Sequence, residues 1–276
     1  MKLTPSTALF AVPVLAMAIP AFGQFQENTE VTLRCESLNR SRGSEHSCEI
    51  RESRLPATQR LEVLASPNGG VALRGWNRSE ILVRARVDAH APTESEAKTL
   101  AGQVNIHAGA GRVTATGPDR PGGNNRWWSV SYEVFVPHHI DLRATTTNGG
   151  IHIEDVEGDI TYSTVNGGVN LARLGGNVRG ETKNGGVNVV MAGDRWHGVG
   201  LDAQTTNGGV NLQLPMNYSA KILASTVNGG LRTEFPVTLS GDLHRSQSLE
   251  FNIGSGGAPI RVVTRNGGVS IRKRAI

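Results

Sequence analysis

The sequence predicts an all-β protein, a right-handed β-solenoid of the parallel β-helix type, with coils of about 18 to 21 residues and one short helix near the N-terminal end. Three observations predict this class. The tripeptide Asn-Gly-Gly recurs along the chain, aliphatic and polar residues alternate on both sides of it, and glycine is frequent, with 34 residues in 276. Glycines that recur in register with apolar residues indicate a repeat architecture and not a disordered chain.

Most copies of the tripeptide follow one another at similar intervals. From Asn148 onward its copies begin 18, 18, 23, 21 and 38 residues apart, and the last interval is close to two steps, as if one copy had lost its signature. The two units of 23 and 21 residues are expected to carry loop insertions on one face. The copies begin at Asn68, Asn148, Asn166, Asn184, Asn207, Asn228 and Asn266.

Each copy reads as strand, turn, strand and second turn. An aliphatic residue follows every Gly-Gly, and the residues before each turn alternate, as Ile160, Tyr162 and Thr164 do. A period of two is typical of a half-buried strand. Because Asn and Gly tolerate a positive φ, we expect each Asn-Gly-Gly to be a corner of the backbone. A hydroxyl residue stands two positions before each Asn, at Ser66, Thr146, Thr164, Thr182, Thr205, Thr226 and Thr264.

Two architectures fit this repeat. In a solenoid, coils stack about 4.8 Å apart in parallel register, so that like residues lie above one another and form side-chain ladders. In the alternative, an antiparallel β-meander, each Asn-Gly would be a hairpin tip. Hairpin tips need only a turn-forming residue, whereas ladders reward identity, so the near-identity of the copies favours the solenoid. The predicted structural ladder consists of the asparagines from Asn148 to Asn266 and the threonines from Thr146 to Thr264.

The region before the main repeats differs in pattern. Strands are expected at Leu61 to Leu73, around Ile81 to Val87, and at Trp128 to Val136. Between the last two, Thr93 and Glu96 form a capping box before a helical pattern, so we expect a short helix that caps one end of the solenoid. Of the adjacent Trp127 and Trp128, one should be buried and the other exposed.

The N-terminus predicts export. Residues 1–23 read as a signal peptide with an apolar stretch from Leu9 to Ile19, and cleavage is expected before Gln24. Residues 24–56 form a polar segment in which Cys35 and Cys48 are expected to form a disulfide, and residues 57–276 form the β-solenoid domain. No later segment is long and apolar enough to cross a membrane. We therefore expect a periplasmic, outer-surface or secreted protein.

The sequence contains no pattern typical of catalysis, of a metal site or of a cofactor. The acidic cluster reads as a charged turn, and a calcium site or an acid–base pair is the alternative; its members are Glu154, Asp155, Glu157 and Asp159. His138 and His139 should point to opposite faces of a strand, as solvated edge residues. Trp196 and His197, in the longest turn insertion, are the best place for a ligand contact.

The net charge of +4 is scattered along the chain, so nucleic acid is not an expected partner. The charges of Arg272–Arg274 would discourage edge pairing of the last strand.

The Thr-x-Asn-Gly-Gly-Val-x-Leu repeats behind a signal peptide, the stretch GGAPIRVVTRNGGVSIRK and the Gly75-Trp76 pair resemble the bacterial "putative adhesin" family, a family of unknown function. The resemblance covers about Leu61 to the C-terminus. It implies a non-enzymatic, exported β-repeat protein that binds an envelope glycan or protein, or that organises the envelope. The alternative is a carbohydrate-active parallel β-helix enzyme, and self-association through an open end of the stack is a further possibility.

Overall fold

The computed structural model describes residues 32–35, 44–119, 125–237 and 247–275. The predicted signal peptide and its cleavage site lie outside these residues. The strands before the main repeats are β1 (Glu45–Pro56), β2 (Arg60–Asn68), β3 (Val71–Trp76), β4 (Glu80–Ala91), β5 (Asn105–Gly109), β6 (Arg112–Thr116) and β7 (Trp127–Pro137), and helix α1 (Glu94–Gly102) follows β4.

The main repeats supply the other strands. They are β8 (Asp141–Asn148), β9 (Ile151–Glu154), β10 (Glu157–Asn166), β11 (Val169–Ala172), β12 (Gly175–Asn184), β13 (Val187–Val190), β14 (Gly200–Asn207), β15 (Val210–Pro215), β16 (Ala220–Asn228), β17 (Leu231–Thr233), β18 (Ser248–Ile253), β19 (Pro259–Asn266) and β20 (Val269–Arg274).

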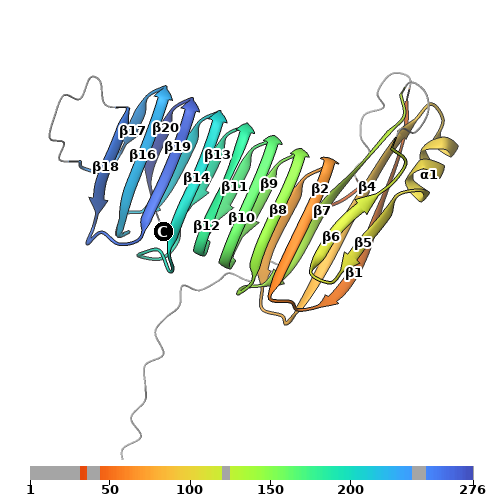
Figure 1. Cartoon of the computed structure of the whole chain (residues 1–276), viewed down its shortest axis with the longest axis horizontal. Helices are drawn as coiled ribbons and strands as arrows, with labels where there is room; N and C mark the ends of the chain where they lie inside the picture. Colours follow the sequence, from red (N-terminus) through yellow and green to blue (C-terminus); the bar gives the residue numbers. More distant parts are fainter. Residues whose placement is uncertain (1–31, 36–43, 120–124, 238–246, 276) are drawn as a thin grey trace, which may run out of the picture.

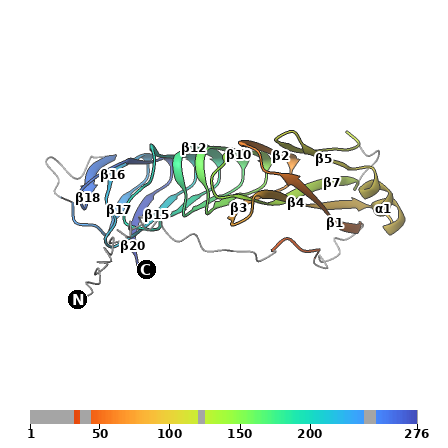
Figure 2. The same cartoon turned by 90° about the horizontal axis from the view of Figure 1, so that it is seen from below.

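The strands form two long sheets that lie face to face (Figures 1 and 2). Sheet A has the order β1-β4-β7-β3-β9-β11-β13-β15-β20-β17, and sheet B has the order β18-β16-β19-β14-β12-β10-β8-β2-β6-β5. Each coil contributes one strand to sheet B, turns at Asn-Gly-Gly, and contributes the next strand to sheet A. Hydrophobic side chains from both sheets fill the space between them, as Val169, Leu171 and Ile160 do.

The coils stack in parallel register. Thr164 opposes Thr182 and Asn166 opposes Asn184, and the same pairing continues from coil to coil. This confirms the predicted β-solenoid with its short N-terminal helix, and the antiparallel meander is wrong for the repeats. Antiparallel pairs occur only at the two ends of the described sheets, as in β1 with β4 and β16 with β18.

The order of the coils in the stack differs from their order in the chain. The last coil, β19 and β20, lies between the coil of β14 and β15 and the coil of β16 and β17. In its described residues, the 38-residue interval therefore contains the antiparallel edge strand β18 and no coil that lost its signature. The predicted edge position of the last strand is also wrong, because β20 pairs with β15 on one side and β17 on the other.

The glycines of the corner serve a purpose beyond the expected positive φ, which Gly69, Gly208 and Gly267 have. None of the corner asparagines has a positive φ, and the first glycine lies directly against the neighbouring coil. A Cβ added at Gly167 would lie 1.9 Å from the carbonyl oxygen of Gly149, and one at Gly185 would lie 2.1 Å from that of Gly167. Glycine is therefore required here by the close approach of two backbones.

Helix α1 begins as the sequence predicts, since the Thr93 hydroxyl accepts a hydrogen bond from the Glu96 backbone N–H at 3.3 Å. It buries Ala97, Leu100 and Ala101, contacts β1 and β4, and lies at the end of the molecule opposite β18 (Figure 1). No helix in the described part of the chain has the length and apolar character needed to cross a membrane.

Candidate functional site

The outer face of sheet A carries a long shallow groove that runs across the strands, parallel to the axis of the stack. Two adjoining hollows of about 760 and 300 Å³ form it, and Asn170 lines both. The larger hollow crosses β11, β13, β15, β20 and β17, and the smaller one crosses β7, β3, β9 and β11. We call this continuous surface the sheet A groove.

Strand alternation places the polar residues of the groove. Val169 and Leu171 point into the core, so Asn170 between them points outward, and the same holds for Asn188, Asn211 and Ser270 in the following coils. Glycines from the corners form one border, where the backbone itself is accessible. Arg232 and Arg272 lie at the end of the groove near β17.

The amides of the groove are partly fixed by one another. The Asn211 side-chain amide donates to Asn188 Oδ1 at 2.8 Å, and Gln213 Nε2 donates to the same oxygen at 3.2 Å. Asn211 Oδ1 has no hydrogen-bond partner among the described residues. That oxygen is buried, so the accessible amide of the groove is that of the exposed Asn170. Oriented amide groups of this kind suit a ligand rich in hydroxyl groups.

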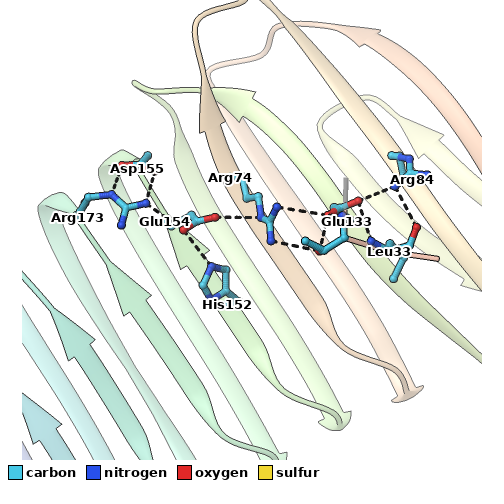
Figure 3. Close-up of polar contacts among 9 residues, drawn as sticks. Leu33, Arg74, Arg84, Glu133, His152, Glu154, Asp155 and Arg173 are labelled. Carbon is cyan, nitrogen blue, oxygen red and sulfur yellow. Dashed lines mark hydrogen bonds and ion pairs between the residues drawn. The ribbon is translucent and has the colours of Figure 1, made fainter. Parts of the chain in front are cut away.

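A row of alternating charges continues across the same face (Figure 3). Asp155 is fully buried, and Arg173 donates to both of its oxygens at 2.6 Å. Glu154 lies 3.0 Å from Arg173 Nη2, 3.0 Å from Arg74 Nε and 3.3 Å from His152 Nε2. These contacts engage both carboxylates.

The other half of the row holds a segment from the N-terminal region. Glu133, which is 1% exposed, accepts hydrogen bonds from the Thr32 backbone N–H at 2.9 Å, from the Thr32 hydroxyl at 2.8 Å and from Arg84 Nη1 at 2.7 Å. Arg84 also donates to the Leu33 carbonyl at 3.2 Å. Residues Thr32–Cys35, the N-terminal strap, are therefore bound to the outer face of sheet A, and Leu33 lines one end of the groove.

The disulfide adds a covalent link to this strap. Cys35 and Cys48 are bonded, with their Cα atoms 5.8 Å apart, and Cys48 belongs to β1. The strap is thus fixed to the edge strand of sheet A by the disulfide and to the strands beside it by charged hydrogen bonds. Such a disulfide is typical of an oxidising compartment.

Two of the three carboxylates of the row, Glu154 and Glu133, favour their charged form. The pKa of Glu154 is lowered to about 2, first by the hydrogen bond from His152 and then, against the burial that raises it, by the charges of His152, Arg74 and Arg173. Burial raises the pKa of Glu133, but hydrogen bonds from Thr32, Arg84 and Leu33 outweigh it, so that this pKa also lies below its ordinary value. Neither group is suited to act as a general acid near neutral pH.

Asp159, another acid of the predicted charged turn, is also held by hydrogen bonds. Asp159 Oδ1 accepts from Asn177 Nδ2 at 3.1 Å and from Arg179 Nη2 at 3.4 Å. Over the described ranges, no group of three His, Cys, Asp or Glu residues is placed to hold a metal ion.

The asparagines of the corners form a continuous amide ladder. Each side-chain amide donates to the Oδ1 of the preceding asparagine in the stack, at 2.7 to 2.8 Å. The ladder follows the stack and not the chain, so that Asn266 lies between Asn207 and Asn228. In order, its members are Asn68, Asn148, Asn166, Asn184, Asn207, Asn266 and Asn228.

The threonines of the predicted ladder are in register but buried. Their hydroxyls do not bond to one another. Thr182 Oγ1 donates to the Gly167 carbonyl at 2.8 Å, and the other threonines make the same bond to the first glycine of the preceding corner in the stack. The threonines therefore lie inside the coils, and only the asparagines form a side-chain ladder at the surface.

Replacement of Asn184 by alanine is expected to destabilise the domain by about 1 kcal/mol. The change removes the bond that Asn184 donates to Asn166 and the bond that it accepts from Asn207, both at 2.8 Å, while the corner glycines stay in place. Thermal or chemical unfolding checks this value. Equal midpoints for the two proteins would show that the ladder contributes nothing to stability.

The sequence also singled out Trp196 and His197 as a ligand contact and His138 as a solvated edge residue, and the structure places them in different environments. Trp196 is buried, and its Nε1 donates to the Gly176 carbonyl at 3.0 Å, so its ring belongs to the core, while His197 is exposed. His138, expected to be solvated, is buried, with Nδ1 2.7 Å from the Asp155 carbonyl oxygen, because it lies under the turn that follows β9. These residues do not line the groove.

A ring cluster on the same face of sheet A was not predicted. Trp127 is 46% exposed and stacks on His90 with ring centroids 3.8 Å apart, and His46 lies 4.6 Å from His90 on ring centroids and 3.1 Å from Asp88 Oδ1. Burial lowers the pKa of His90, and the neighbouring His46 lowers it further. Trp128 is half-buried, and its Nε1 donates to the Pro118 carbonyl.

A search of solved structures finds matches to proteins that are called putative adhesins, and one to a protein called a putative lipid binding protein. One is a putative cell adhesion protein from Clostridium sporogenes, at 14% identity over 83% of this chain and 100% of that one, with a TM-score of 0.45. Another is a putative adhesin from Bacteroides fragilis, at 9% identity over 82% and 97%, with a TM-score of 0.36. A third, from Parabacteroides distasonis, is called a putative lipid binding protein, at 10% identity over 83% and 97%, with a TM-score of 0.27. No protein-family model and no curated protein sequence matches this chain. All three TM-scores lie below 0.5, and no conclusion about the role or ligand of this chain is drawn from these matches.

Proposed function

We propose that this chain is an exported, non-catalytic cell-envelope or surface protein that binds an extended glycan along the sheet A groove. The observation that supports the proposal most is the continuity of the groove. It runs from Gly70, directly before β3, to Arg272 on β20. Each coil adds about 4.8 Å to its length. One sugar ring of an extended glycan advances by nearly the same distance, so successive rings meet equivalent groups on successive coils.

The chemistry of the groove fits such a polymer. Asn170, Asn188, Asn211 and Ser270 both donate and accept hydrogen bonds, as sugar hydroxyls require. The glycine border lets a flat ring approach the backbone. Arg232 and Arg272 would favour a glycan that carries carboxylate or phosphate groups at this end. Because the groove is shallow, affinity would come from many weak contacts along the chain.

Export rests on two features. The disulfide between Cys35 and Cys48 is stable in an oxidising compartment, and the first 23 residues have the pattern of a signal peptide. Either the periplasm or the cell exterior satisfies this condition.

The alternative of a carbohydrate-active enzyme has less support. Glycoside hydrolysis needs two carboxyl groups that face each other across the bound sugar. In the described part of the chain no Asp or Glu lines the groove, and the nearby Glu154 and Asp155 are held by Arg173. We therefore propose binding without turnover.

The proposal is tested with a glycan array and with purified envelope fractions, using the wild-type chain and Asn170→Trp. Asn170 is exposed and lies where the two hollows meet, so a large ring there is expected to block the groove and weaken binding at least about tenfold, or 1.4 kcal/mol. Glu181→Trp is the matched control, because Glu181 is exposed on β12 in the opposite sheet. Equal weakening by both variants would contradict the groove as the site, and absence of binding to every glycan and fraction would contradict the glycan as ligand.

A further inference from the structure

The C-terminal coil, Pro259–Arg274, fills a slot between two coils that precede it in the chain. On sheet B, Ile260 lies between Leu201 and Ile222, and on sheet A, Val269 lies between Val210 and Leu231. The backbone N–H of Gly208 donates to the Asn266 carbonyl at 3.0 Å, and that of Gly267 donates to the Asn228 carbonyl at 2.9 Å. The coil is thus hydrogen-bonded along both of its edges.

The two coils that border the slot do not pair with each other. β14 pairs with β12 and β19, and β16 pairs with β19 and β18; in sheet A, β15 pairs with β13 and β20, while β17 pairs with β20. Among the described strands, only the inserted coil joins β16, β17 and β18 to the rest of both sheets. The slot is therefore an interface for a strand–corner–strand segment of the repeat pattern.

The segment that fills the slot is held to its own chain by a short glycine-rich loop. Gly254, Gly256 and Gly257 have φ angles of 55°, 74° and 138°, and they join β18 to β19. Short loops of this kind act as hinges when identical elements are exchanged between protomers. All pairing partners of the coil lie in residues 200–233, so a coil from another copy would make the same bonds.

We propose that this slot accepts the C-terminal coil of a second copy of the chain, which gives a reciprocally exchanged dimer. Each slot would receive Ile260, Val262, Val269 and Ile271 as core residues and Asn266 as the ladder member between Asn207 and Asn228. The exchange is closed, because each copy donates one coil and accepts one. The inserted β20 also carries Ser270 and Arg272, so each sheet A groove would contain residues of both copies.

The test uses two single variants of the full chain, Asn207→Cys and Asn266→Cys. These side chains are hydrogen-bonded neighbours at 2.7 Å in the ladder, so their Cα atoms lie within disulfide range of each other. The variants carry different mass tags, are unfolded together without reductant, refolded over a range of protein concentrations and then oxidised. We expect a disulfide-linked heterodimer whose yield rises with concentration.

Three controls define the result. The double variant Asn207→Cys/Asn266→Cys must form its internal disulfide, which shows that refolding and geometry are intact. Each single variant alone gives the background of random crosslinks. Asn184→Cys mixed with Asn266→Cys places the thiols one further ladder step apart, beyond the reach of a disulfide, and should give only background. Monomers alone at every concentration, with the double variant oxidised, would overturn the proposal; this outcome leaves the glycan-binding proposal untouched, because no glycan is present.

Discussion

Replacement of Gly185 by alanine is expected to lower the free energy of unfolding by about 3 kcal/mol or more. The new Cβ would lie 2.1 Å from the carbonyl oxygen of Gly167 and 2.5 Å from its carbonyl carbon, and both atoms are backbone. Relief requires the two coils to separate. That movement would stretch the bonds from Gly167 N to the Asn184 carbonyl at 3.0 Å and from Val169 N to the Gly186 carbonyl at 2.9 Å.

Gly230→Ala is the matched control for this change. Gly230 is the second glycine of the Asn228 tripeptide, whereas Gly185 is the first glycine of its own. A Cβ added at Gly230 meets nothing within 4 Å, because no further described coil covers it. Chemical unfolding followed by circular dichroism should therefore give a small effect for Gly230→Ala and a large one for Gly185→Ala. Equal effects would mean that backbone entropy, and not the contact between coils, explains the glycine.

The repeat itself made the coil predictable. Identity at Thr, Asn and Gly in every copy is needed only if like positions touch, and the structure shows what each residue contacts. Asn184 bonds to the next asparagine, Thr182 bonds to a glycine carbonyl, and Gly185 leaves room for the adjacent backbone. The pattern indicated contact between like residues. The inward direction of the hydroxyl was also present in it, because Thr164 shares its strand face with Ile160 and Tyr162, which are buried.

The order of the coils could not be predicted from the same pattern. Since every copy carries the same corner, each coil is an acceptable neighbour for any other, and local sequence does not specify which pairs form. The sequence feature that indicates a changed order of the coils is the 38-residue interval before Asn266. This interval is too long for one coil and contains β18. A long interval indicates an excursion of the chain as readily as a degenerate repeat, and the structure shows the excursion.

The groove and the charged row also differ in how far the sequence pattern predicts them. Asn170, Asn188 and Asn211 recur at one position of the repeat, so their alignment on one face follows from the alternation of strands. Thr32, Arg74, Glu133 and Glu154 come from four distant segments and obey no period. Their meeting depends on how β7 and the N-terminal strap return to sheet A, which is a tertiary property that the pattern of residues does not contain.

Replacement of Glu133 by alanine is expected to destabilise the folded chain by about 3 kcal/mol at pH 7, because two buried guanidinium groups lose one of their carboxylate partners. Arg84 keeps Glu52 and Arg74 keeps Glu154, so the effect lies at the lower end of that for a broken buried pair. Arg84 and Arg74 lie 2.7 and 3.6 Å from its oxygens, and both are less than 10% exposed. The strap should also detach from sheet A, since Thr32 donates two hydrogen bonds to this carboxylate. Limited proteolysis near Thr32 measures the detachment, and chemical unfolding measures the stability.

The pH dependence of this effect separates charge from packing. The pKa of Glu133 is lower in the folded chain than its ordinary value of 4.5, so its charge stabilises the fold above pH 4.5 and this contribution is lost as the pH falls through the lower, folded value. The difference between the wild type and Glu133→Gln should therefore shrink on acidification. Glu80→Ala is the control, because the Arg54–Glu80 pair is exposed and a surface pair contributes only about 0 to 1 kcal/mol. Equal losses of stability for Glu133→Ala and Glu80→Ala would contradict this prediction. The charged row would then contribute no more to stability than an exposed ion pair, and the strap would be held by the disulfide and not by the charges.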